Sequence, residues 1–176
     1  NQVALGDINL EGLKVDIAEG DLVDAATLKP ALRGCRGLFH VAADYRLWVP
    51  DPGPMLKANV EGTRTIMLTA AESGVERIVY TSSVATLGIL PGDGVADEDT
   101  PVAFGDMIGP YKQSKFLAEA EVRELAAGQG LPVVIVNPSM PVGPRDIKPT
   151  PTGRMIVEAA LGKMPAYVDT GLNAVH

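Results

Sequence analysis

Short apolar runs alternate along the chain with longer stretches in which apolar residues recur three and four positions apart. Short runs, alternating or continuous, are typical of strands, whereas the three-and-four spacing is typical of amphipathic helices. The strands that these patterns predict lie at residues 13–17, 37–43, 77–81 and 132–136. The helices that they predict lie at about residues 24–33, 54–73, 108–127 and 152–161.

The strands after the first are nearly continuous apolar runs, which predicts that they are buried on both faces. Pro30 conflicts with a helix interior and predicts a short turn that restarts with this proline in the first helical turn. Residues 88–109 are rich in Gly, Pro and Asp and predict a loop, and the prolines that follow Asn137 predict an ordered binding loop. Strands separated by crossover helices run parallel, so the predicted fold class is α/β, with helices on both faces of the sheet.

The composition is that of an ordinary globular protein. The 176 residues are 46% hydrophobic and 21% charged, with a formal net charge of −7. The acidic balance argues against a nucleic-acid partner, since phosphate binding requires a basic face. No apolar stretch approaches the roughly 18 residues of a spanning helix, so no membrane insertion is expected. The single cysteine, Cys35, forms no disulfide within the chain and fits a reducing cytoplasm.

Polar side chains gather where the predicted strands end. In open α/β sheets, ligands bind outside the carboxyl ends of the strands. The residues at these ends are Asp21, Asp44, Tyr45, Thr81, Ser82, Ser83, Asn137 and Ser139. Turn formation alone would account for about half of them, because the same residue types favour turns.

Tyr111 and Lys115 form the sharper feature. Four residues apart on a helix, they share one face, and a neighbouring ammonium favours the phenolate, whose ordinary pKa near 10 is otherwise too high for acid–base work. A surface pair with no function would show the same spacing. The preceding strand ends in Thr81-Ser82-Ser83, whose hydroxyls could bind the same reacting oxygen. A Ser, Tyr and Lys trio on successive β-α units predicts a carbonyl oxidoreduction site.

These blocks resemble the extended short-chain dehydrogenases/reductases, the class of nucleotide-sugar epimerases and dihydroflavonol reductases. The matching stretches, in the family's order between about residues 13 and 145, are residues 19–22, 38–43, 59–63, 79–83, 111–115 and 137–139. Residues 42–48 and 143–153 further resemble the hopanoid-associated sugar epimerase branch, whose members are often labelled dihydroflavonol-4-reductase-like. The resemblance implies a Rossmann-type doubly wound parallel sheet, incomplete at both ends, with the start of a small substrate-binding lobe.

The resemblance implies a role for four catalytic residues. Tyr111 would be the acid/base, and Lys115 would lower its pKa and also hold the nicotinamide ribose. Ser83 would polarise the substrate carbonyl, and Asn59 would support the geometry of the site. The implied activity is NAD(P)-dependent oxidation, reduction or epimerisation of a sugar nucleotide or a similar hydroxyl or keto compound by hydride transfer.

The same resemblance implies NAD or NADP as cofactor and no metal. Besides Lys115, the residues implied to bind the cofactor are Asp21, Leu22, Ala42, Ala43, Ser82, Pro138 and Ser139. Asp21 and Leu22 would line the adenine pocket. Ala42 and Ala43 would pass under the cofactor. Pro138 and Ser139 would face the nicotinamide. The candidates on the substrate side are Asp44, Tyr45 and Arg145.

The family opens with a Gly-rich turn that cradles the pyrophosphate, and no such motif precedes Leu13. We therefore expect residues 1–150 to be a partial dinucleotide-binding domain, residues 151–176 to begin the substrate-binding lobe, and the sequence to be a piece of a longer chain that does not turn over substrate alone. The family commonly forms homodimers through the pair of helices that matches 54–73 and 108–127, and we expect the same here.

Several features have a plainer interpretation. His40, inside an apolar strand, is expected to be a hydrogen-bonded core residue, and Trp48 is expected to pack in its loop as readily as to stack on a substrate. The acidic residues 97–99 are expected to be a solvated cluster and not a metal site. A different class of function stays open: a non-catalytic relative of the same fold that binds a dinucleotide as a regulatory ligand.

Overall fold

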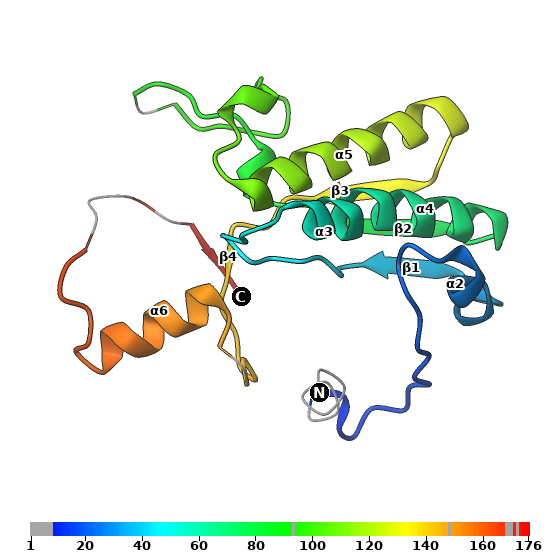
Figure 1. The fold of residues 1–176 in the computed structure, drawn as a ribbon, viewed down its shortest axis with the longest axis horizontal. Coiled ribbons are helices and arrows are strands. Elements are labelled where there is room, and N and C mark those ends of the chain that lie inside the picture. Colours follow the sequence, from blue (N-terminus) through cyan, green and yellow to red (C-terminus); the bar gives the residue numbers. More distant parts are fainter. Residues whose placement is uncertain (1–8, 93, 148, 168–170, 172) are drawn as a thin grey trace. The chain divides into compact units, whose positions relative to one another are not determined.

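The computed structural model describes residues 9–92, 94–147, 149–167, 171 and 173–176. The chain divides into two compact units. The larger unit spans Ala18–Pro138, and the smaller one combines residues 1–17 with 139–176 (Figure 1). The predicted domain boundary at about residue 150 concerns the whole protein and stays a prediction.

A parallel sheet forms the centre of the larger unit. Its strands are β1 (Gly37–His40), β2 (Arg77–Thr81) and β3 (Val133–Val136), in the order β1-β2-β3. Leu38 lies opposite Ile78, and Ile78 lies opposite Val133. Each crossover between neighbouring strands contains a long helical segment, as parallel pairing requires. The predicted α/β class with parallel strands is confirmed.

The helix predicted at 54–73 is present, but it is not uniform. It consists of α3 (Gly53–Leu56), a π-helical turn η1 (Lys57–Glu61) and α4 (Gly62–Glu72). A π turn inserts an extra residue into the helical ladder, and such turns are frequent at functional sites. The sequence pattern did not predict this turn, which contains the buried Asn59.

The other helices of the larger unit are α2 (Ala25–Leu32) and α5 (Pro110–Gln129), and two short 3₁₀ turns, η2 (Val84–Thr86) and η3 (Phe104–Asp106), lie in the connection from β2 to α5. The predicted interruption of α2 at Pro30 is wrong, because the helix runs through this proline. Proline removes one backbone hydrogen bond from a helix. Asp24 caps the helix start and the buried Leu28 and Leu32 flank Pro30, so capping and packing offset that loss.

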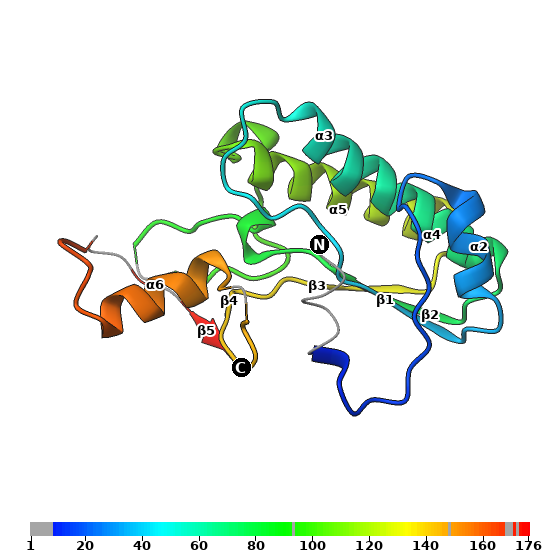
Figure 2. The ribbon, with the colours of Figure 1, turned by 60° about the horizontal axis from the view of Figure 1, so that its bottom comes forward.

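The core lies on one face of the sheet. Figure 2 shows α4 and α5 side by side above the strands, and α2 packs against α4. The buried residues of this layer are Leu28, Leu32, Ile66, Met67, Ala70, Val75, Ile78, Tyr80, Ala118, Val122, Leu125 and Leu131. These side chains come from both the helices and the strands, so the helical layer and the sheet stabilise each other.

The opposite face of the sheet is exposed, so the prediction of strands buried on both faces is wrong. Phe39 is 77% exposed, and Val134 and Val136 are also exposed. In these strands, successive side chains point to opposite faces, and within the described residues only one face receives helices. A continuous apolar run therefore identified each strand correctly, but it did not show whether helices pack on both faces of the sheet.

The strand predicted at residues 13–17 is also wrong. These residues form no regular structure, and Leu13, Val15 and Ile17 are exposed. A strand needs a hydrogen-bonded neighbour, and β1 pairs only with β2 among the described strands. The period-two pattern was correct for a strand, but the described chain supplies no partner for it.

The smaller unit contains β4 (Met140–Pro141), β5 (Ala174–Val175) and α6 (Pro151–Ala160). β4 and β5 pair in parallel. The helix predicted at 152–161 is confirmed: Thr150 caps it by accepting a hydrogen bond from the backbone N–H of Gly153 at 3.2 Å. Over the described part of the chain, no helix has the length and apolar character to cross a membrane.

Met67, which is fully buried in α4, provides a test of this core. Met67→Ala in the full-length protein should lower the free energy of unfolding by about 2–5 kcal/mol, because truncation leaves a cavity between α4 and the sheet. Chemical denaturation measures the loss. The partly exposed Met164 provides the matched control: Met164→Ala should change stability by less than about 1 kcal/mol. Equal losses for both variants would contradict the assigned core.

Candidate active site

The start of α5 places Tyr111 and Lys115 at the carboxyl end of the sheet. Gly109 precedes the helix with φ of 88°, a conformation that favours glycine, and Pro110 occupies the first helical position. Tyr111 and Lys115 therefore fall in the first two turns. Lys115 is 3% exposed, whereas Tyr111 is half-buried.

The Lys115 ammonium is bound to the end of β2. Its Nζ donates to the Thr81 carbonyl at 2.7 Å and to the Tyr80 hydroxyl at 3.3 Å, and it lies 4.8 Å from the centre of the Tyr80 ring. Burial lowers the pKa of Lys115 to about 8, against the raising effect of the Glu119 carboxylate. Lys115 thus joins α5 to the residue that directly precedes Ser82 and Ser83.

Tyr80 and His40 lie beneath this ammonium. His40 Nε2 is 2.9 Å from the Thr63 hydroxyl, and its ring stacks on Tyr80 with 5.6 Å between centres. Burial, followed by the positive charge of Lys115, lowers the pKa of His40 to about 4. Burial, followed by the negative charge of Glu119, raises the pKa of Tyr80 above its usual range. Both groups are therefore neutral near pH 7, and the prediction of a hydrogen-bonded core histidine is confirmed.

The two serines after β2 have different surroundings. Ser82 is buried and its hydroxyl donates to Glu119. Ser83 is half-buried, and its hydroxyl accepts a hydrogen bond from the backbone N–H of Ala85 at 3.1 Å, which caps η2. The Ser83 hydroxyl can still donate its proton to another acceptor. A substrate oxygen would need such a donor.

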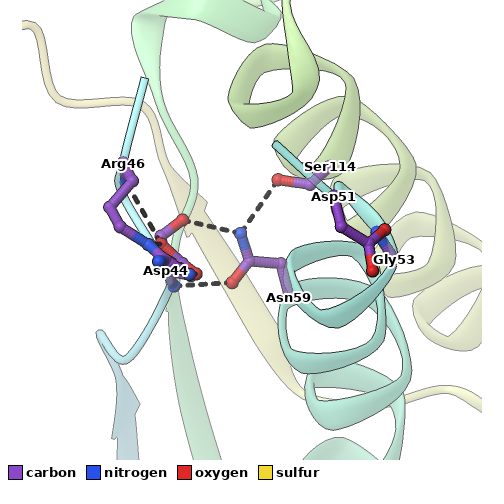
Figure 3. A network of polar contacts seen from close by, with 6 residues as sticks. All are labelled: Asp44, Arg46, Asp51, Gly53, Asn59 and Ser114. Atoms are coloured by element: carbon purple, nitrogen blue, oxygen red, sulfur yellow. Dashed lines mark hydrogen bonds and ion pairs between the residues drawn. The ribbon is translucent and has the colours of Figure 1, made fainter. Parts of the chain in front are cut away.

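Asn59, in the π turn, connects two loops of the site. Its Oδ1 accepts from the Asp44 backbone N–H at 2.7 Å, and its Nδ2 donates to the Asp44 carbonyl and to the Ser114 hydroxyl, both at 2.9 Å (Figure 3). Ser114 in turn donates to the Tyr111 carbonyl at 2.8 Å. Asn59 therefore links the segment after β1 to the helical turn that carries Tyr111.

The segment after β1 carries the substrate candidates of the larger unit. Asp44 forms an ion pair with Arg46, in which Arg46 Nε donates at 2.9 Å, and this hydrogen bond holds the pKa of Asp44 below its usual range. Tyr45 and Trp48 are exposed, Trp48 at 76%. The sequence interpretation overlooked Arg46, although its spacing of two residues from Asp44 was visible.

The predicted cofactor residues of the larger unit occupy turns and strand ends. Asp21 accepts a hydrogen bond from the Val23 N–H at 3.1 Å. Leu22 packs so closely on Gly62 that a Cβ there would come within 2.9 Å of the Leu22 Cβ, which explains the glycine. Ala42 is exposed and Ala43 is half-buried just after β1. Pro138, after β3, accepts from the Val84 N–H at 3.0 Å.

Ser139 and Arg145 belong to the smaller unit. Arg145 has φ of 66°, the left-handed region that few non-glycine residues adopt, and it lines a cavity of about 470 Å³ within that unit. The cavity is otherwise bounded by residues of 141–157 and by His176. Hydrogen bonds therefore connect Asn59 and Lys115 to neighbouring segments within the larger unit, whereas Ser139 and Arg145 belong to the smaller unit.

Glu119 is a second residue that the sequence interpretation missed. It is 5% exposed and accepts hydrogen bonds from Ser82, Thr86, Arg123 and Asn137. Burial raises the pKa of its carboxyl, but these four hydrogen bonds outweigh burial and hold the pKa below its usual value. The signal was present, because Glu119 follows Lys115 by four residues and so shares its face of the helix.

No group of three or more His, Cys, Asp or Glu side chains that could hold a metal ion occurs among the residues that the structure describes. In the acidic run 97–99, Asp97 Oδ1 accepts from the Asp99 N–H at 3.1 Å and from the Thr100 hydroxyl at 2.9 Å, a local turn. This arrangement agrees with the solvated-cluster interpretation.

Comparison with known proteins shows which family this chain resembles. Residues 4–173 match the model of the NAD dependent epimerase/dehydratase family. A Synechocystis sp. protein, provisionally named as a dihydroflavonol 4-reductase, is 52% identical over 168 residues, which cover 95% of this chain and 48% of the relative. Sterol demethylase protein B of Methylococcus capsulatus is 40% identical over 159 residues, 90% of this chain and 48% of the relative.

A solved structure agrees with these relationships. The crystal structure of gox2253 is 62% identical and superposes with a TM-score of 0.90, over 96% of this chain and 51% of that one. The chain thus spans about half the length of the relatives that it matches. The family match and this superposition confirm the Rossmann-type parallel sheet that the resemblance implied.

The low pKa of His40 predicts a pH dependence of stability. Its folded-state pKa of about 4 lies below the ordinary 6.5, so its stabilisation is complete above pH 6.5 and is lost as pH falls toward 4. The loss should be roughly 1.4 kcal/mol per pH unit, because only the unfolded state takes up the proton there. His40→Asn should flatten the pH dependence of unfolding, and His176→Asn, at an exposed site, should not. An unchanged slope in His40→Asn would contradict the assignment.

Asn59→Asp tests the link between Asp44 and α5. The carboxylate keeps the shape and accepts from the Asp44 N–H, but it cannot donate to the Asp44 carbonyl or to Ser114. We expect a loss of about 1–3 kcal/mol in the free energy of unfolding, measured by denaturation of the full-length protein. The exposed Asn173 provides the control, and Asn173→Asp should change stability by less than about 0.5 kcal/mol. A fully stable Asn59→Asp would show that the link carries no energy.

Proposed function

The chain belongs to the NAD dependent epimerase/dehydratase family, and from this membership we propose that the protein is an NAD(P)-dependent oxidoreductase or epimerase that works through Ser83, Tyr111 and Lys115. The single observation that carries the proposal is the 2.7 Å hydrogen bond from Lys115 Nζ to the Thr81 carbonyl. This hydrogen bond joins the first two turns of α5, which contain Tyr111 and Lys115, to the strand end that leads to Ser83.

Each of the three side chains has a role that follows from its chemistry. The Tyr111 hydroxyl exchanges a proton with the oxygen of the substrate carbinol or carbonyl. Ser83, whose oxygen already accepts from Ala85, donates its hydroxyl proton to the same substrate oxygen. The buried Lys115 ammonium stabilises negative charge on the Tyr111 oxygen, and burial strengthens that attraction.

The residues present fit a nicotinamide dinucleotide. An ammonium has three N–H donors, and the described structure gives Lys115 two acceptors, so one donor is free for a ribose hydroxyl. Ala42 and Ala43 present little bulk at the end of β1, where the cofactor would pass. We propose that Asp21 and Leu22 lie at its adenine end and Pro138 and Ser139 near its nicotinamide end. Ser82 belongs to the same proposed cofactor-binding set. When bound, the nicotinamide supplies or accepts the hydride, as NAD or as NADP.

The names of the relatives support a substrate with a reducible carbonyl group, since they include a dihydroflavonol 4-reductase and cinnamoyl-CoA reductases. We propose a sugar nucleotide or a similar compound, with Asp44, Tyr45 and Arg145 on the substrate side. Epimerisation would use the same catalytic residues twice, and the keto intermediate would rotate between the two steps.

We further propose that the enzyme is a homodimer through the helical segments 54–73 and 108–127, and that it works in the cytoplasm. The Arg64–Glu121 ion pair, 2.6 Å between Nη1 and Oε2, joins α4 to α5 and keeps the two helices together as one surface. The single Cys35 fits a reducing compartment.

Tyr111→Phe in the full-length protein tests the proposal. Reduction of a dihydroflavonol with NADPH or NADH, and epimerisation of a UDP-sugar, are the assays, and the better one sets the reference. Loss of the proton donor should lower kcat by about 10²- to 10⁴-fold. Binding of NADH or NADPH, followed by nicotinamide fluorescence, should change less than about threefold, because Tyr111→Phe leaves Lys115 in place.

The exposed Tyr167 supplies the matched control, and Tyr167→Phe should retain full activity. Near-wild-type turnover in Tyr111→Phe would contradict the proposed acid/base. A wild-type protein that binds NADH or NADPH but turns over no substrate would favour the alternative, a non-catalytic relative that binds a dinucleotide as a regulatory ligand.

A further inference from the structure

Glu119 is a buried carboxylate at which three segments of the larger unit meet. Its Oε2 accepts from the Ser82 hydroxyl after β2, from Thr86 Oγ1 in η2 at 2.8 Å, and from Asn137 Nδ2 after β3 at 2.9 Å. Its Oε1 accepts from Arg123 Nε at 2.9 Å, one helical turn further along α5. Both carboxylate oxygens of Glu119 therefore accept hydrogen bonds, which offset the cost of burying the charge.

The hydrogen bonds around Glu119 fix the segment that contains the candidate catalytic serine. Asn137 Nδ2 also donates to the Ser83 carbonyl at 3.2 Å, and Thr86 Oγ1 lies 2.7 Å from the same carbonyl, so its one hydroxyl proton is shared between that carbonyl and Glu119. The two residues that hold the Ser83 backbone are therefore themselves held by Glu119. One residue before, the Ser82 hydroxyl is bound directly.

Lys115 lies one turn before Glu119 on the same helix and holds the neighbouring residue, Thr81. Lys115 therefore binds Thr81 directly and Glu119 binds Ser82 directly, and Glu119 reaches Ser83 only through Thr86 and Asn137. The position of the serine relative to the lysine is set by this pair and not by the sheet alone.

We propose that Glu119 is a positioning residue that fixes Ser83 and Lys115 relative to each other through its hydrogen bonds to Ser82, Thr86 and Asn137. The proposal rests on the function proposed above for Ser83 and Lys115, but it concerns a residue outside that trio. Glu119 acts through these neighbours and touches neither substrate nor cofactor.

The charge of Glu119 adds a second, measurable effect. The ionisable groups that interact with Lys115 are His40 from β1, Tyr80 from β2 and Glu119 from α5, and Tyr111 precedes it by four residues on the same helix. Among these, Glu119 is the carboxylate, and its charge opposes the lowering of the Lys115 pKa by burial. Removal of that charge should lower the pKa of Lys115 further, whereas a purely structural anchor would leave it unchanged.

Glu119→Gln in the full-length protein separates the two roles. The amide keeps the size of the side chain but removes the charge, and one of its two ends becomes a donor that faces other donors. Glu76→Gln is the matched control, since Glu76 is an exposed glutamate outside these helices and pairs with Arg36. Glu119→Asp keeps the charge and tests rescue.

Two readouts are needed. The first is the pKa of Lys115, from the pH dependence of its acetylation by acetic anhydride, quantified by mass spectrometry. We expect about 8 in the wild type and a value lower by about one unit in Glu119→Gln. The second is dihydroflavonol reduction with NADPH, in which kcat should fall at least about tenfold with little change in KM, because the catalytic groups are misplaced while substrate contacts remain. Glu76→Gln should change neither readout, and Glu119→Asp should restore part of both.

An unchanged Lys115 pKa and a kcat within about twofold of wild type in folded Glu119→Gln would overturn the proposal, even with a lower melting temperature. If Glu119→Gln does not fold, Glu119→Asp decides on the same readouts: its shorter side chain cannot span all four partners, so a fully normal kcat would again overturn it. If the wild type binds no NADPH, the proposed function fails, while the Lys115 pKa still reports whether Glu119 positions that lysine.

Discussion

The buried hydrogen bond from the Lys115 ammonium to the Thr81 carbonyl is the constraint on which the site depends. A buried charge is costly unless it is hydrogen-bonded, so α5 must dock where Lys115 reaches the acceptors at the end of β2. That docking requires Gly109 and Pro110 to start the helix at the correct residue and requires a neutral His40 and Tyr80 beneath the ammonium. The positions of the catalytic candidates therefore depend on how α5 docks on β2.

Two further polar residues extend the same fit to neighbouring segments. Asn59 connects the segment after β1 to the Tyr111 turn, and Glu119 connects the ends of β2 and β3 to the next turn of α5. Each presents a fixed set of donors and acceptors that only one arrangement satisfies, and no buried side-chain nitrogen or oxygen of the described residues lacks a partner. The larger unit therefore combines an apolar layer, which supplies most of the stability, with a polar layer that specifies the geometry of the strand ends.

Much of this arrangement could be predicted from the sequence, and the misses have physical causes. Local periodicity identified the strand before Thr81 and the helix with Tyr111, and the order of the motifs identified the extended short-chain dehydrogenase/reductase class, which the family match confirms. The apolar pattern shows that a strand can be buried, but its actual burial depends on which elements pack against the sheet. The exposed face of the sheet that carries Phe39 was therefore not predicted. Glu119 was missed because its partners, such as Asn137, are distant in sequence and meet only in the folded chain.

The central claim is that a charged, buried Lys115 supports proton transfer by Tyr111, and the pH profile of kcat in the full-length enzyme tests it most directly. Since Lys115 must be protonated, activity should fall as pH rises through about 8, the pKa that burial gives this lysine. Lys115→Arg, whose side chain stays charged, should abolish that fall, even at a lower overall rate. A wild-type profile without an alkaline decline, or the same decline in Lys115→Arg, would contradict the account.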